Sequence, residues 1–600
     1  MSALNHHRVQ SLPPQDVIVW SGAGTSIPRP TNLPSGIDLT RRVIEHACLP
    51  GTWDRIVNRY LVPAAMLDVN GSLKTVPRLE SVLDCLWTVI GPAAMDPLSI
   101  CGRAVPNDLH AILAGHVATG AHHVTLNFDR CIEHCLIAAY HHRVLHLHGT
   151  YDPARLADLG ARVSRVSVGF PPEVSDDLRS LLTSSRALVF IGYSGSDAFD
   201  VTPFFTNLSA EGVRLPKLSV LWIRHRTGVE QPSPVIIGTP GFRMLEALSQ
   251  CGATVSCYEA ETSTFLLGLA RAWRLRVPAA PSNPVRASPP PTAPLSAEER
   301  LLATSQLYTS QGIGSEVLAL RPDLETLSNR LPRNSSRRML AIGHLEDAYR
   351  NVGFYLRAAR IARLISDGSA LGHVKAIHRL AGDRWLRGDY RRAVLLLQWA
   401  LIACRIAACL ARDQQLREWL SKEGIDIRIT ALHIQRDISR TRNLAARLLR
   451  PYALELLRRA IRDLGRDMGS PHNRAKVERL CEELEASRSG ILFPPALHNA
   501  SRDAVFTETD SLIGWINVHR RTLSAAWHNG LPITSTDLDQ LEESSRRIED
   551  RPGLLKAALL RRAATGQQAP WIPQLLSEIE WGGRLRRRWE KCWNEGKPWV

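Results

Sequence analysis

Some features are scarce in this sequence of 600 residues, and each scarcity excludes a class of protein. The chain has 11 cysteines but no C-x-x-C pair, which argues against a zinc ribbon and a thioredoxin-type redox site. We therefore expect neither zinc nor another metal. No run of about 18 uninterrupted apolar residues occurs, and residues 1–14 lack the apolar core of a signal peptide. Together these two absences predict a cytoplasmic protein with no membrane partner.

Lysine is also scarce: only 8 of the 74 basic residues are lysine, so the net charge of +16 rests on arginine. Hydrophobic residues at 44% and charged residues at 22% are typical of soluble globular domains and exclude a wholly disordered chain. Almost all of the excess positive charge follows residue 277. This asymmetry is typical of a nucleic-acid-binding surface, and a general bias toward arginine accounts for it nearly as well.

The chain divides at a proline-rich stretch. Residues 277–295 read VPAAPSNPVRASPPPTAPL, and proline at this density is compatible with neither a helix nor a central strand. Residues 278–297 are therefore expected to form an extended linker. They separate an N-terminal domain, residues 1–277, from a C-terminal domain, residues 298–600.

The N-terminal domain alternates short apolar runs with helical stretches. Such runs are typical of parallel strands that helices cover on both faces. We therefore predict an α/β fold with a doubly wound parallel sheet, whose ligands bind beyond the carboxyl ends of the strands. Residues 40–120 look mainly helical and are predicted to form an inserted lobe. The predicted strands are Val17–Trp20, His123–Leu126, Val144–Leu147, Ala187–Ile191, Leu218–Ile223 and Thr254–Tyr258.

The C-terminal domain is rich in Leu, Ala, Arg and Glu at helical spacing and shows almost no strand pattern, so an all-α domain is predicted. Residues 353–358 (GFYLRA) match residues 388–393 (GDYRRA) at an offset of 35, which is close to the tetratricopeptide period of about 34. Unrelated helical hairpins would also produce such a pair of matches. The domain is helical under either interpretation.

Small and polar residues follow four of the predicted strands. The first strand runs into Ser21–Ser26 (SGAGTS), whose Gly-x-Gly turn lets the backbone approach a phosphate. The second strand is followed by Asn127 and Asp129, the third by His148–Gly149, and the fourth by residues 192–197 (GYSGSD). Because the carboxyl ends of parallel strands share one edge of a sheet, we expect these groups to lie together.

Taken in order, the motifs GAGTS, TLNFD, HLHGT and GYSGSD resemble those of the sirtuin family. They look most like its bacterial sirtuin-like branch, whose members cleave NAD in anti-phage defence. The resemblance covers about residues 15–260, less than half of the chain. It implies a Rossmann-like, sirtuin-type fold with NAD as the substrate.

The resemblance also implies a role for each matching position. Asn127 would hold the nicotinamide ribose and the attacking water, with Asp129 supporting its loop, and His148 would contact the ribose hydroxyls and act as general base. The glycine-rich turn would cradle the NAD phosphates through Gly22, Ala23, Gly24 and Ser26. The adenosine half would be bound by Gly192, Ser194 and Asp197.

Local structure offers another interpretation of some of these residues. Asn127 or Asp129 would also suit the N-cap of a helix that starts near Arg130. For Asp129, capping and support of the site are equally good interpretations, whereas for Asn127 the other motifs favour the site. His146 is in phase with the buried strand and is interpreted as structural, so His148 at the strand exit is favoured as the catalytic histidine.

The chain departs from protein-deacylating sirtuins in two places. Residues 150–186 contain no cysteine and are too few for the zinc module of those enzymes, and Ile27–Leu33 (IPRPTNL) stands in place of their G-I-P-D-F-R motif. Both departures argue against deacylation and leave water as the acceptor. The predicted reaction is hydrolysis of NAD to nicotinamide and ADP-ribose.

We thus expect an NAD glycohydrolase that acts as a bacterial abortive-infection effector. Its helical domain would sense a trigger, such as a phage protein, or drive assembly into a homo-oligomer. One alternative is a non-catalytic module that binds NAD or ADP-ribose. Another is an effector whose C-terminal domain binds nucleic acid through arginines and tryptophans of residues 546–589, although arginines on the solvated faces of a helical core are favoured there.

Overall fold

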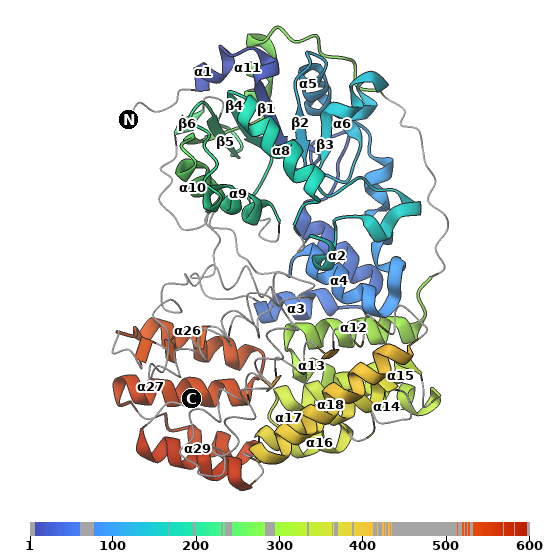
Figure 1. The fold of residues 1–600 in the computed structure, drawn as a ribbon, viewed down its shortest axis with the longest axis vertical. Coiled ribbons are helices and arrows are strands. Elements are labelled where there is room, and N and C mark those ends of the chain that lie inside the picture. Colours follow the sequence, from blue (N-terminus) through green and yellow to red (C-terminus); the bar gives the residue numbers. More distant parts are fainter. Residues whose placement is uncertain are drawn as a thin grey trace. The chain divides into compact units, whose positions relative to one another are not determined.

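A computed structural model of the chain shows two compact units (Figure 1). One unit comprises Met1–Ala47 and Met66–Leu295, and the other comprises Cys48–Ala65 and Ser296–Val600. The structure describes residues 6–60, 77–166, 169–195, 200–229, 232–234, 243–281, 294–332, 335–362, 364, 370–386, 389–411, 532–567, 569–580 and 583–596, and single residues between 417 and 434 and between 513 and 527.

The N-terminal unit is built on a sheet whose described strands follow the order β3-β2-β1-β4-β5-β7-β6. Neighbouring strands are parallel, except that β6 pairs antiparallel with β7. The six parallel strands have the order of a doubly wound sheet, which confirms the predicted α/β fold. Each predicted strand is found within about two residues of its expected ends. The strands are β1 Val17–Ser21, β2 His123–Thr125, β3 Val144–His146, β4 Ala187–Ile191, β5 Ser219–His225, β6 Ser233–Pro234 and β7 Thr254–Ala260.

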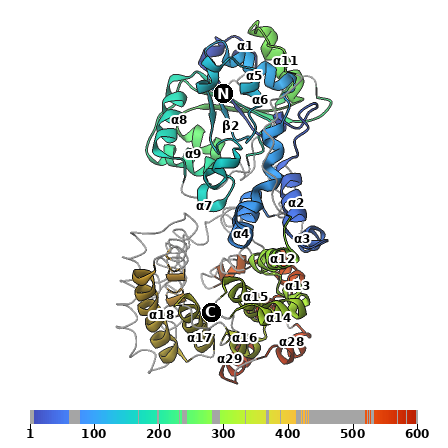
Figure 2. The same cartoon turned by 90° about the vertical axis from the view of Figure 1, so that its right-hand side faces the viewer.

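Helices cover both faces of this sheet (Figures 1 and 2). Because successive side chains of a strand point to opposite faces, Ile18 and Trp20 of β1 join one buried core and Val17 and Val19 join the other. Burial on both faces is the reason that apolar residues predominate in the strands. The first core is closed by α8 (Pro172–Ser184), α9 (Val201–Ala210) and α10 (Arg243–Gln250), and the second by α1 (His6–Gln10), α5 (Asp108–Val117) and α11 (Thr262–Ala272).

The register of the sheet aligns the ends of four strands. Ser21 of β1 lies opposite Thr125 of β2 and Ile191 of β4, and Thr125 in turn lies opposite His146 of β3. The four polar segments of the sequence begin one or two residues beyond this row. They therefore leave the sheet at one edge.

The chain between β1 and β2 is mainly helical where it is described. Helices α2 (Gly36–Ala47), α4 (Leu79–Ile90), the 3₁₀ segment η4 (Gly91–Arg103) and α5 belong to the N-terminal unit. Helix α3 (Thr52–Tyr60) instead belongs to the C-terminal unit. The expected lobe of residues 40–120 is thus shared between the two units.

Helix α3 is held within the C-terminal unit by polar contacts near both of its ends. Just before α3, the Leu49 N–H donates to Thr304 Oγ1 (2.8 Å), and at its far end Arg59 donates to the Arg547 carbonyl (2.7 Å) and pairs with Glu316 (3.1 Å). Ile56, between them, is fully buried. The chain therefore enters the C-terminal unit at α3, returns to the sheet, and enters it again after the proline-rich stretch.

The described C-terminal unit consists of helices, which confirms the predicted all-α domain. Two helical hairpins follow one another, α15 with α16 and α17 with α18, and corresponding helices begin 34 and 35 residues apart. Gly353 joins the first pair with a φ of +89°, which glycine adopts without strain. Gly388, its predicted counterpart, lies outside the described residues. The helices are α12 Ala297–Gln311, α13 Gly314–Ala319, α14 Arg321–Arg330, α15 Ser336–Asn351, α16 Tyr355–Ala362, α17 Ala370–Leu386, α18 Tyr390–Leu410, α26 Ser535–Arg547, α27 Arg551–Thr565, α28 Ile572–Glu578 and α29 Gly583–Glu595.

Helix α18 is apolar along most of its length. Among the described residues it is the one helix long and apolar enough to cross a membrane, with a mean hydropathy of 2.1 and 33% of that window buried. The sequence criterion of an unbroken apolar run missed it because the exposed Arg405 interrupts the run. Its exposed apolar side chains share one side of the helix: Leu395, Trp399, Ile402, Ile406 and Leu410.

Candidate functional site

The glycine-rich turn after β1 packs directly against the turn after β4. A Cβ atom on Gly22 or Gly24 would lie 2.8 Å from a backbone atom of Gly192, and one on Gly192 would lie 2.8 Å from the Thr25 nitrogen. The Gly24 N–H donates to the Gly192 carbonyl (2.9 Å). These glycines are therefore required by the contact between the two turns, whatever ligand binds beside them.

The amides of this turn are mostly used within the protein. The N–H groups of Gly22, Gly24, Thr25 and Ser26 each donate to a backbone carbonyl at 2.9–3.1 Å. In the described part of the chain, Ala23 is the residue of this turn whose N–H has no such acceptor, and Ala23 is exposed. A phosphate at this turn would thus contact the backbone mainly at Ala23, which is fewer amides than the sequence motif suggests.

Asn127 is held by both its backbone and its side chain. Its N–H donates to Thr125 Oγ1 (3.1 Å), and its Nδ2 group donates to Ser26 Oγ (3.0 Å) and Thr25 Oγ1 (3.4 Å). Both hydroxyls already donate their own protons elsewhere, Thr25 to the Gly22 carbonyl and Ser26 to Asp129, so they must accept from the amide. The side-chain carbonyl oxygen of Asn127 is therefore the group left to face a ligand.

The Ser26 hydroxyl stands at the centre of a buried network. It donates to Asp129 Oδ2 (2.9 Å) and accepts from Asn127 and from Nε2 of His110 (3.1 Å). His110 accepts the Asn107 N–H at Nδ1 (3.1 Å), so the proton of the neutral ring sits on Nε2. Burial lowers the pKa of His110 and keeps the ring neutral. The Ser26 hydroxyl thus uses all of its hydrogen-bonding capacity within the protein, whereas the resemblance implied a contact with a phosphate.

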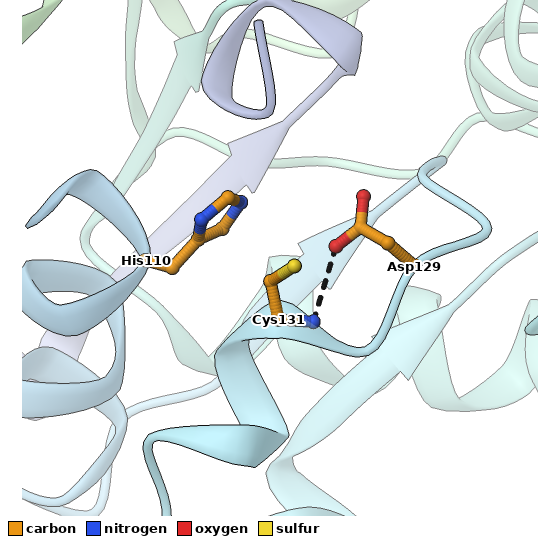
Figure 3. A group of neighbouring side chains, drawn as sticks. All are labelled: His110, Asp129 and Cys131. Carbon is orange, nitrogen blue, oxygen red and sulfur yellow. Dashed lines mark hydrogen bonds between the residues drawn. The ribbon is translucent and has the colours of Figure 1, made fainter. Parts of the chain in front are cut away.

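His110, Asp129 and Cys131 form a cluster that resembles a metal site (Figure 3). Their ligand-type atoms lie within 4.8 Å of one another and all three residues are buried. Both ring nitrogens of His110 already have partners, and Asp129 accepts the Cys131 N–H with one oxygen and Ser26 with the other. Burial and the charge of Asp129 raise the pKa of Cys131, so its sulfur is a thiol, not the thiolate that binds metals. These donors fit a hydrogen-bonded cluster better than a bound cation.

Asp129 lies one residue before Arg130, the N-cap of α6 (Cys131–His134), so it is not the N-cap itself. Its Oδ1 accepts the N–H of Cys131 (3.1 Å), the first residue of α6, and so serves the start of that helix. Its Oδ2 supports the Ser26 network. Asn127 contributes no cap contact to α6, since its amide points to the turn after β1.

His146 forms a buried ion pair behind Asn127. Its Nδ1 donates to the Asn127 carbonyl (3.0 Å) and its Nε2 to Glu133 Oε1 (2.8 Å). Both partners only accept, so the ring must carry two protons. Burial alone would lower the pKa of His146, but the hydrogen bond and charge of Glu133 outweigh it and raise that pKa. The predicted structural role of His146 thus takes the form of an ion pair with Glu133.

We predict that this pair stabilises the fold most between about pH 4.5 and pH 6.5. The pKa of His146 is raised from 6.5, so its contribution is complete below that value and is lost as the pH rises through the raised pKa. The pKa of Glu133 is lowered from 4.5, because the hydrogen bond from His146 outweighs burial, so its contribution is lost as the pH falls. Thermal unfolding of wild type and His146→Gln from pH 4 to pH 9 tests this prediction. A constant difference in Tm across that range would contradict it.

His148 lies at the exit of β3 and is 6% exposed. Its Nε2 lies 2.7 Å from Oδ2 of Asp200, which is 3% exposed. Its ring also lies near Phe128, with centroids 6.3 Å apart. The predicted catalytic histidine is therefore close to the segment that carries Asn127 and is paired with a buried carboxylate.

The turn after β4 contains the remaining predicted site residues. Gly192 packs on the turn after β1, and Ser194 is exposed. Asp197 lies outside the described residues. Tyr193, between the two, is buried and stacks on Trp222 at 5.5 Å. This turn is thus anchored by its aromatic residue and presents Ser194 at the surface.

Three residues of the site were missed by sequence reasoning: His110, Glu133 and Asp200. The side chains of Asn107 and His110 form a capping box at the start of α5, so the spacing N-D-L-H was a usable signal for this helix start. Glu133 and Asp200 carry no local motif. They reach the site only through the packing of helices α6 and α9 on the sheet.

The arginines that suggested nucleic-acid binding are largely engaged within the C-terminal unit. Trp589 is 3% exposed and belongs to a core, while Trp581 lies outside the described residues. The pairs are Arg546 with Glu542 (3.7 Å), Arg547 with Glu543 (2.9 Å), Arg561 with Glu542 (2.7 Å) and Asp539 (2.6 Å), and Arg562 over the ring of Trp593 (4.3 Å).

Comparison of the chain with models of protein families, with curated proteins and with solved structures finds no match in any of the three. Arguments about function therefore rest on the residues and their geometry.

Proposed function

We propose that the N-terminal unit is a sirtuin-like NAD glycohydrolase, which uses water to cleave NAD to nicotinamide and ADP-ribose. The observation that carries this proposal is the juxtaposition at one edge of the sheet. Asn127 follows β2, and two hydroxyl groups set the orientation of its side-chain amide. His148 follows the neighbouring strand β3 and is paired with a buried carboxylate. The doubly wound order of the strands adds support, because ligands of such sheets bind at this edge.

The proposed reaction breaks the N-glycosidic bond between the ribose and nicotinamide. The bonding pair leaves with the pyridinium nitrogen, so nicotinamide departs neutral and the ribose acquires oxocarbenium character. The carbonyl oxygen of Asn127 carries partial negative charge and stabilises this developing positive charge. Water attacks the anomeric carbon and gives a proton to His148, which yields ADP-ribose.

Water is preferred to acyl-lysine as the acceptor because the chain lacks the paired cysteines of the deacylase zinc module. Uncontrolled hydrolysis would deplete NAD and kill the cell, so we propose that the C-terminal unit holds the enzyme in the cytoplasm at a low but measurable activity until a trigger raises it. The two hairpins with tetratricopeptide-like spacing suggest that this unit binds a phage protein or another copy of the chain. The internal pairing of its arginines makes nucleic acid a less favoured partner.

Nicotinamide release by the full chain tests the proposed function. We expect purified protein to release nicotinamide and ADP-ribose from NAD in equal amounts. The rate of release by His148→Ala should be lower by a factor of about 10² or more. Chromatography of both products, at several protein concentrations to allow for assembly, gives the result. Binding of NAD without any product would contradict hydrolysis and favour the non-catalytic binding module.

A further inference from the structure

Asp200 is the buried carboxylate that faces the proposed catalytic histidine. Its Oδ2 lies 2.7 Å from Nε2 of His148, and the two side chains are 3% and 5% exposed. Its other oxygen accepts the N–H of Val201 (2.7 Å), the first residue of α9. Capping of α9 needs one carboxylate oxygen, so the second contact requires a separate reason.

The fold brings Asp200 to His148 from a distant strand. His148 follows β3, whereas Asp200 follows β4, and β2 and β1 lie between those strands in the sheet. With strands spaced about 4.8 Å apart, β3 and β4 lie about 14 Å apart. The segments that follow them must therefore cross the carboxyl ends of β2 and β1 before His148 and Asp200 can meet. The contact between His148 and Asp200 therefore links the segments that follow β3 and β4, on either side of β2, the strand that Asn127 follows.

The pairing also places a proton on one nitrogen of His148. A carboxylate only accepts hydrogen bonds, so Nε2 carries the proton of this contact. In water the imidazole would exchange between both tautomers and several rotamers. A buried partner 2.7 Å away removes that freedom before substrate binds.

We infer that Asp200 is a positioning residue for His148: it holds the imidazole in one orientation at the exit of β3. This inference rests on the proposed function. Asp200 itself touches neither the substrate nor the water. Its effect should appear in the rate of the chemical step and should depend on His148.

The test uses the full chain with Asp200→Asn, since asparagine still caps a helix but carries no charge to hold the imidazole. We expect kcat for nicotinamide release to fall about 10²-fold with a change in KM below about threefold. The double variant His148→Ala/Asp200→Asn should be no slower than His148→Ala alone, because the two residues act as one unit. Asp152→Asn, which alters another N-cap aspartate of this unit, serves as the control and should keep wild-type kcat.

Two results would overturn the positioning role: wild-type kcat in Asp200→Asn, or additive losses in the double variant. If Asp200→Asn does not fold, Asp200→Ser replaces it, because serine caps α9 but is too short to reach His148. A wild-type chain that releases no nicotinamide would instead remove the proposed function, and with it this role. A cycle of Tm values for the same variants without NAD separates the cases, since non-additive shifts report the contact whether or not the chain is an enzyme.

Discussion

Replacing Asn127 with alanine is expected to lower kcat for nicotinamide release by about 10²- to 10³-fold while the chain stays folded. The side-chain oxygen of Asn127 is oriented before substrate arrives, because the hydroxyl groups of Ser26 and Thr25 already donate to other acceptors and must accept from Nδ2. Alanine removes that oxygen at the moment when positive charge develops on the ribose. Steady-state hydrolysis of NAD, with Tm as the measure of folding, gives the result.

Asn207→Ala is the matched control, since Asn207 is exposed on α9 of the same unit. It should keep wild-type kcat. Asn127→Asp should be as slow as Asn127→Ala, because a carboxylate would place an acceptor against two hydroxyls that already donate elsewhere. An active Asn127→Ala enzyme would refute the assigned role of this amide.

Replacing Gly192 with alanine is expected to destabilise the N-terminal unit by about 3 kcal/mol or more. The residue has a φ of +57°, which costs an L-residue about 1–2 kcal/mol, and the new methyl group would lie 2.8 Å from the Thr25 nitrogen and 3.0 Å from the Gly24 carbonyl carbon. Both neighbours are backbone atoms of a turn that is itself tightly packed. Thermal unfolding, together with hydrogen exchange over β1 and β4, measures the loss.

Gly212→Ala separates conformational strain from the contact between the turns. Gly212 also has a positive φ, +74°, but a Cβ atom there would meet nothing within 4 Å. We expect it to cost about 1–2 kcal/mol, so the difference between the variants measures the contact. Equal effects of the two substitutions would show that the turns after β1 and β4 do not pack as described.

The division of the chain affects how the protein should be studied. A fragment of residues 1–277 would contain α3 without the rest of the unit to which it belongs, including Glu316, the ion-pair partner of Arg59. A loss of activity in that fragment would then not distinguish misfolding from the absence of an activating unit. The full chain with point substitutions avoids this difficulty.

Sequence reasoning succeeded where the pattern is local. Runs rich in apolar residues predicted the six parallel strands, because most side chains of the strands are buried between the sheet and its helices. The order of motifs placed Asn127, Asp129 and His148 at one edge, since parallel strands must end together. The helical nature of the C-terminal domain followed from its composition in the same way.

The class of each unit and the edge at which the polar residues gather could thus be predicted from the residues alone. How those residues are used became clear only from the folded chain: Ser26 donates to Asp129, His146 pairs with Glu133 and a carboxylate faces His148. The difference follows from the range of the interactions. Periodicity and strand ends are set by neighbours in the chain, whereas a hydrogen bond between residues 148 and 200 exists only once helices and sheet have packed.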